Sequence, residues 1–139
     1  MKICSGMNFP AVVGPAAPKG NNYGCLSKQP GPSWFFFEVD RPGNIAMNVK
    51  AAKDIDFIAW GPFTSERDLL AACGNLKTQV SCSFSGSKTE TVKISNAKSG
   101  QHYMILITNY AKINQNVNAS AAPGNTGSMK CPRIPKQIL

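Results

Sequence analysis

The stretch that decides the fold class is Asp54-Ile55-Asp56-Phe57-Ile58-Ala59-Trp60-Gly61. Its apolar side chains recur with a period of two residues, which is the period of a β-strand. Ile55, Phe57 and Ala59 fall on one face, so we expect this face to cover a hydrophobic core. The other face carries two carboxylates and a tryptophan, and it requires either a covering layer or a ligand. The Gly61-Pro62 pair is expected to end the strand.

The same alternation, or a continuous apolar run, predicts six further strands. They are expected at residues 34–39, 44–50, 79–84, 89–94, 102–110 and 113–120. Strands 34–39 and 102–110 are apolar on both faces and are expected to be buried on both. Ser65, followed three residues later by Asp68, is a capping pattern that predicts a short helix within residues 65–74.

Short strands separated by turns, with one short helix in a connection, predict an all-β fold. The expected architecture is an antiparallel β-sandwich of the jelly-roll or Greek-key type. A chain of 139 residues is the size of a single domain, 1–139. Within it we expect an extended, proline-rich N-terminal arm at 1–33, the β-sandwich at 34–120 and a C-terminal tail at 121–139.

The composition is basic, with 15 Lys and Arg against 7 Asp and Glu. A positive protein attracts anionic partners, of which an acidic polysaccharide or another glycan is the one we expect. The lysines form no run and lie in no nucleic-acid motif, so no specific nucleic-acid partner is predicted. No apolar run approaches the ~20 residues of a membrane span. No signal peptide is visible before Cys4, so we expect a mature fragment or a module of a larger protein.

Five cysteines, without metal-binding spacing, favour disulfides in an oxidising compartment, and hence an extracellular or cell-surface location. Cys73 and Cys82 are close enough in sequence to close a small loop, which makes them the first predicted pair. Cys4 with Cys25 is the second. Cys131 is then expected to be unpaired, its partner lying upstream of this chain or in another chain.

Asp54, Asp56 and Trp60 are the candidate ligand-binding residues, because an aromatic plane beside polar acceptors suits a sugar. The competing interpretation places the 65–73 helix or the N-terminal arm over Trp60. The two acids could also bind calcium, with Glu38, Asp40 or backbone carbonyls completing the shell. The interpretation we favour is that they accept hydrogen bonds from loop amides, so no metal and no cofactor are predicted.

No catalytic residues are predicted, and the chain is not expected to be an enzyme. His102 is the only histidine, and no flanking signature of a nucleophile accompanies it. We expect it to be an exposed residue at the end of a strand. Asp54 and Asp56 lie on one strand face rather than across a cleft, which disfavours a glycosidase.

Several motifs now identify a resemblance. The series Asp54-x-Asp56-Phe57, Glu90-x-Val92 and Gly100-x-x-Tyr103 resembles the bacterial pre-peptidase C-terminal (PPC) domain. The segments NYGCLSKQPGPSW (22–34), DIDFIAWGPF (54–63) and ITNY (107–110) are similar to a related domain of secreted Bacteroidetes surface proteins. The resemblance covers about residues 4–131. Members of the closer family tend to carry a further cysteine before the position of Cys4, which this chain lacks.

The resemblance implies a jelly-roll-like, non-catalytic module of large exported proteins, and it implies no ligand. We therefore expect an extracellular binding or adhesion module of a larger protein, which binds a glycan or a surface. Its partners would be other domains of the parent protein or copies of itself, and weak contacts would add through multivalency. The alternative is a structural subunit that assembles into a fibre or shell through its arm or an edge strand.

Overall fold

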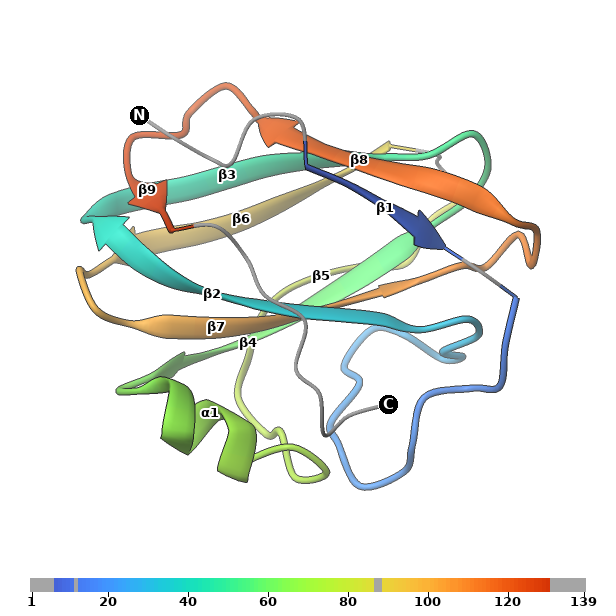
Figure 1. Ribbon diagram of the computed structural model, residues 1–139, viewed down its shortest axis with the longest axis horizontal. Coiled ribbons are helices and arrows are strands. Elements are labelled where there is room, and N and C mark those ends of the chain that lie inside the picture. Colours follow the sequence, from blue (N-terminus) through green and yellow to red (C-terminus); the bar gives the residue numbers. More distant parts are fainter. Residues whose placement is uncertain (1–6, 12, 87–88, 131–139) are drawn as a thin grey trace.

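The computed structural model describes residues 7–11, 13–86 and 89–130, which form two antiparallel sheets packed face to face (Figure 1). One sheet has the strand order β1-β8-β3-β6 and the other the order β5-β4-β7-β2-β9. The strands are β1 (Met7–Ala11), β2 (Ser33–Arg41), β3 (Gly43–Lys50), β4 (Asp56–Phe63), β5 (Gln79–Ser83), β6 (Thr89–Ala97), β7 (His102–Thr108), β8 (Gln115–Ala121) and β9 (Ser128–Met129), and the helix is α1 (Glu66–Ala71). The all-β sandwich prediction is confirmed.

The chain changes sheet at almost every connection, as in a jelly roll, and stays within one sheet only from β4 to β5. The β1 strand lies in the predicted arm and pairs with β8, whereas β9 lies in the predicted tail and pairs with β2. Both terminal segments thus contribute strands to the sandwich outside the predicted range 34–120.

β7 is the central strand of the five-stranded sheet, between β4 and β2. The prediction that β4 ends at Gly61 is wrong, because the strand continues past a bulge until Phe63 pairs with His102. Gly61 makes this possible: its φ is 145°, and a Cβ atom there would lie 2.6 Å from Cδ1 of the Tyr103 ring. Only a glycine allows the backbone this close to the neighbouring side chain.

The inner core fills the space between the two sheets. It consists of Ala11, Phe35, Phe37, Val39, Ile45, Met47, Val49, Ala51, Ile55, Phe57, Ala59, Val92, Ile94, Ala97, Tyr103, Ile105, Ile107, Val117, Ala119 and Met129. The alternation of β3 and of the first half of β4 therefore has the direction predicted from sequence.

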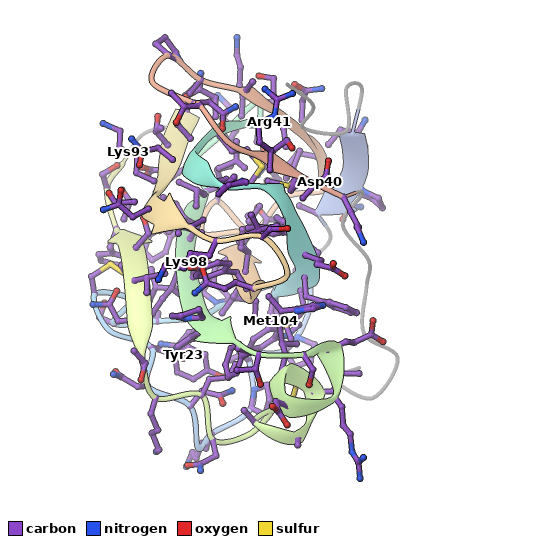
Figure 2. All side chains as sticks on the ribbon, turned by 90° about the vertical axis from the view of Figure 1, so that its left-hand side faces the viewer. Tyr23, Asp40, Arg41, Lys93, Lys98 and Met104 are labelled. Atoms are coloured by element: carbon purple, nitrogen blue, oxygen red, sulfur yellow. A yellow bond between two sulfur atoms is a disulfide. The ribbon has the colours of Figure 1, made fainter. Side chains whose placement is uncertain are left out.

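The outer core covers the opposite face of the five-stranded sheet, where Figure 1 shows α1 and part of the N-terminal arm beneath that sheet. It consists of Ala17, Leu26, Trp34, Phe36, Ile58, Trp60, Leu69, Leu76, Met104 and Leu106. Figure 2 labels Met104 of this core and Tyr23, which packs against it from the arm. Apart from the half-buried Glu38, residues 34–39 and 102–108 are buried on both faces because each face meets one of the two cores.

The short helix was predicted correctly, since the Ser65 hydroxyl accepts a hydrogen bond from the Asp68 amide at 3.1 Å and caps the first turn. The α1 helix contributes Leu69, which is fully buried, to the outer core. Gly74 adopts the expected left-handed conformation, with a φ of 86°, three residues after the helix ends.

Both predicted disulfides are wrong, because Cys25 of the arm is bonded to Cys82 of β5. Their Cα atoms lie 6.1 Å apart, within the normal range for a disulfide. The arm crosses the outer face of the sheet to cover its apolar side chains, and this path carries Cys25 to the edge strand. Cys73 is a free, half-buried thiol packed against the outer core. Cys4 and Cys131 lie outside the described residues.

The disulfide joins residues 57 positions apart, so its loss frees a long loop in the unfolded chain. We expect the double variant Cys25→Ser/Cys82→Ser to lose about 2–4 kcal/mol of unfolding free energy in urea denaturation. Cys73→Ser is the matched control and should lose about 1 kcal/mol or less. Equal losses in the two variants would contradict the Cys25–Cys82 pairing.

Candidate functional site

Trp60 is fully buried in the outer core and is not a sugar platform. Its ring stacks on Trp34, with the centroids 5.7 Å apart, and meets the edge of Tyr23 at 6.0 Å. The indole N–H donates to the backbone carbonyl of Asn22 at 2.8 Å. The proposed ligand role of Trp60 is therefore wrong, and the competing interpretation, in which the arm and α1 cover it, is correct. The sheet face that carries Trp60 is apolar, so it is covered by other segments of the same chain.

Asp54 and Asp56 do lie together, and Glu90 of β6 joins them from the other sheet. One carboxylate oxygen from each residue lies within 4.8 Å of the others. Glu90 accepts hydrogen bonds from the hydroxyls of Ser83, at 2.5 Å, and Ser85, at 2.7 Å. We call these three acids the carboxylate cluster.

Part of the favoured interpretation of the acids is correct, because Asp56 Oδ1 accepts a hydrogen bond from the Ser85 amide at 2.9 Å. Its other oxygen, Oδ2, is buried and has no hydrogen-bond partner among the described residues, and the same holds for Asp54 Oδ1. Burial raises the pKa of Asp56 to about 7, against the effect of the Ser85 amide and with further repulsion from Asp54 and Glu90. Burial, followed by repulsion from Glu90, also raises the pKa of Asp54.

A groove of about 530 Å³ opens where the N-terminal arm, the loop before β2 and the β7–β8 loop meet. These segments lie at the right-hand end of the sandwich in Figure 1. Lys28 and Lys112 line the groove together with Val13 and Asn109. Among the described residues no carboxylate forms a salt bridge with either lysine. We call this region the lysine groove.

The β7–β8 loop, residues 109–114, is held in place by a buried asparagine. The Asn109 side chain donates to the carbonyls of Ala11 and Ile113, and its Oδ1 accepts from the side-chain Nε2 of Gln115 at 2.7 Å. The Asn109 backbone N–H donates to the Pro30 carbonyl at 2.9 Å. A single buried residue thus links the three segments that form the groove through hydrogen bonds.

Exposed apolar side chains gather at the same end. Phe84 and Tyr110 form an edge-to-face pair with centroids 5.4 Å apart, and both are exposed. Val13 of the arm and Ile113 of the β7–β8 loop are also exposed. The backbone N–H of Val13 donates to Oδ1 of Asn114, which lies in the β7–β8 loop. This end therefore combines apolar surface with two lysines, a composition suited to binding.

His102 is buried, contrary to the predicted exposed position, because it starts the central strand rather than a peripheral one. Its Nε2 lies 3.5 Å from the Glu38 carboxylate, which also pairs with Lys130 at 3.0 Å. Glu38 and Asp40 therefore do not join Asp54 and Asp56. Asp40 instead accepts from the Ser128 hydroxyl at 3.3 Å, beside β9.

The sequence predictions missed Glu90, Lys28, Lys112 and Asn109. Glu90 carried a usable signal, since it shares the inward parity of Val92 and Ile94 and is a carboxylate at a core position. Lys28 and Lys112 carried none, because their proximity depends on the path of the arm.

No family model, no curated protein and no solved structure matches this chain. The resemblance to PPC-like domains of surface proteins therefore stays a prediction. The part of the chain that the structure covers contains no helix long and apolar enough to cross a bilayer.

Trp60 is expected to act through packing alone. The Trp60→Ala substitution removes a fully buried aromatic side chain and its hydrogen bond, so the unfolding free energy should fall by about 3–5 kcal/mol. The exposed aromatic variant Phe84→Ala is the control and should cost about 1 kcal/mol or less. Urea denaturation measures both, and an unchanged midpoint for Trp60→Ala would contradict the burial described here.

Asp56 should make stability depend on pH. The folded protein holds the Asp56 proton up to about pH 7, whereas the unfolded chain releases it near its ordinary pKa of 3.8. Burial favours the neutral, protonated form of Asp56 over the ionised form. The contribution of Asp56 to the unfolding free energy therefore falls as the pH rises from the unfolded pKa to the folded pKa. Its full cost is reached above about pH 7.

In EDTA, the thermal midpoint of Asp56→Asn relative to wild type should rise from about pH 5 to about pH 8. Asp40→Asn, which changes an exposed acid, should show no such trend relative to wild type. A constant difference for Asp56→Asn across this range would contradict the raised pKa.

Proposed function

We propose that this chain is a non-catalytic binding module of a larger exported protein, and that it binds an anionic polysaccharide in the lysine groove. The observation that carries the proposal is the position of Lys28 and Lys112 on one preformed groove. Neither ammonium is neutralised by a salt bridge within the described chain, so both are available to sulfate or carboxylate groups.

The size of the groove and the hydrogen bonds that link its walls support the proposal. Its volume of about 530 Å³ lies within the range of small-molecule sites. The Asn109 hydrogen bonds hold all three walls, so a ligand would meet a site that needs little ordering. The formal net charge of +8 would also steer an anionic chain toward the protein before contact.

The exposed apolar side chains beside the groove extend the surface that a polysaccharide would touch. Tyr110 lies in the chain between Asn109 and Lys112, which line the groove, and Phe84 packs against Tyr110. Sugar rings present C–H groups that pack on aromatic side chains, so an acidic sugar can use both kinds of contact. This pair takes the place in the proposal that the sequence had assigned to Trp60.

The Cys25–Cys82 disulfide supports an extracellular or cell-surface location, since such bonds persist in oxidising compartments. The resemblance to surface-protein modules points to the same location. In the larger protein, weak binding by each module would be multiplied by repetition on one surface.

The alternative, a structural subunit, has less support because the arm is engaged within its own chain. Its β1 strand pairs with β8, Leu26 is buried in the outer core, and Cys25 is bonded to β5. The β1 edge also carries Pro10, which cannot donate to a further strand. A subunit that exchanged this arm would have to break all of these contacts.

The test is binding to an immobilised sulfated polysaccharide, with neutral dextran as the control ligand. Lys28→Gln/Lys112→Gln should weaken binding about 10-fold or more, because each lost contact with an anion is worth about 1 kcal/mol or more in a partly desolvated groove. The charge-matched control is Arg41→Gln/Lys98→Gln, whose side chains Figure 2 shows at the end of the sandwich facing the viewer, opposite the groove.

Equal losses in the two double variants would show that net charge, rather than the groove, determines binding, and would overturn the site. Light scattering of the same samples separates the two functions. A monomer that binds supports the module, whereas regular assemblies without polysaccharide binding would favour the structural subunit.

A further inference from the structure

We propose that the carboxylate cluster, Asp54, Asp56 and Glu90, is a calcium-binding site. This site is separate from the lysine groove, and the proposal does not depend on the proposed function. The cluster joins both sheets, because Asp56 begins β4, Asp54 lies two residues before it, and Glu90 lies in β6.

The separation of the acids suits a single ion of this size. Calcium binds oxygen ligands at about 2.3–2.6 Å, so two ligands of one ion lie at most about 4.6–5.2 Å apart. One oxygen of each of the three acids lies within 4.8 Å of the others. Magnesium retains its water more strongly and is seldom bound by protein oxygens alone, which favours calcium at a site of three carboxylates. The cluster offers only oxygen ligands, which disfavours zinc.

An unsatisfied buried carboxylate provides independent support. Asp56 is only 1% exposed, and in the described part of the chain its Oδ2 has no hydrogen-bond partner. Asp54 Oδ1 is buried and unpartnered as well. Within the described residues no lysine or arginine forms a salt bridge with any of the three acids. Buried carboxylates without a cation are costly, and a divalent ion would neutralise them.

Three other carboxylate oxygens of the cluster accept hydrogen bonds from Ser83 and Ser85. The Ser83 and Ser85 hydroxyls donate to the two oxygens of Glu90, and the Ser85 amide donates to Asp56 Oδ1. Metal sites commonly have such outer contacts, which orient the ligands before the ion arrives. Asp54 is half-exposed and leaves a path for the ion and for the waters that would complete its coordination.

A calcium ion here would stabilise the end of the sandwich that carries the aromatic pair. The ion would connect β4 to β6. Through Glu90 it would also be linked to Ser83 and Ser85, the residues on either side of Phe84. The Asp54 carbonyl accepts from the Ala111 amide at 3.1 Å, which links the cluster to the β7–β8 loop. The ion would thus hold the loop that borders the lysine groove.

The experiment uses the whole oxidised chain after removal of divalent ions with EDTA and dialysis. Isothermal titration with CaCl₂ at constant ionic strength should show one ion per chain. We expect a dissociation constant on the order of 10⁻⁴–10⁻³ M, as in extracellular calcium modules. The thermal midpoint should rise in calcium and rise less in magnesium at the same concentration.

The variants distinguish a metal site from the other possible state of these acids, in which the carboxylates share a proton and bind no metal. Asp56→Asn should be at least as stable as wild type in EDTA, because repulsion is removed, and should gain little from calcium. Glu90→Gln and Ser85→Ala should each weaken calcium binding by about 10- to 100-fold. Asp40→Asn, which changes an acid outside the cluster, should bind calcium as wild type does.

Calcium at ~10 mM is well above the expected dissociation constant. If the titration then shows no binding heat, and if the wild-type thermal midpoint is the same in calcium and in EDTA, the proposal is overturned and the acids share a proton instead. Binding that Asp56→Asn and Glu90→Gln both retain at wild-type strength would also overturn it. If one variant fails to fold, the other variants and the wild-type comparison still decide. Polysaccharide binding through Lys28 and Lys112 is tested separately, so either proposal can fail alone.

Discussion

The structure depends on a central β4–β7–β2 ladder that is apolar on both faces. A sheet of this kind cannot leave either face in water, so the fold must supply two covering layers. The four-stranded sheet covers one face and encloses the inner core. The arm and α1 cover the other face and enclose the outer core. The chain crosses repeatedly from one sheet to the other, which brings the four-stranded sheet over the inner face. The arm folds back over the outer face and covers it together with α1.

The second layer explains the features that bear most on function. Because the arm must cover Trp60, that residue is lost to ligands, and Cys25 is carried to its bond with Cys82. The same path places Lys28 in the wall of the groove that Lys112 also lines. Packing of apolar surface, rather than attraction between ligand-binding residues, therefore assembles the groove, and Asn109 then fixes its walls through hydrogen bonds. The proposed binding site is a consequence of how the sheet is covered.

The carboxylate cluster and the lysine groove lie in segments linked by the β7–β8 loop, yet they carry opposite charge. Asp56 and Glu90 are buried, Asp54 is half-exposed, and three of their oxygens accept hydrogen bonds, whereas the lysines are exposed. Burial raises the pKa of Asp56 and makes the acids a liability without a cation, whereas the exposed lysines are available to an anion. One loop thus connects a region suited to a divalent cation with a region suited to an anionic polymer.

Periodicity in the sequence was sufficient to determine the all-β class, seven of the nine strands of the described residues to within three residues at their ends, and the short capped helix. These properties depend on neighbours in sequence, because side-chain alternation and capping act within a few residues. Periodicity did not find β1 and β9, whose strand character depends on pairing with β8 and β2. Tertiary structure alone decided the partner of Cys82, the covering of Trp60, the burial of His102 and the meeting of Glu90 with Asp54 and Asp56. Each of these depends on which distant segment covers which face of the sheet, and local sequence patterns do not encode that choice.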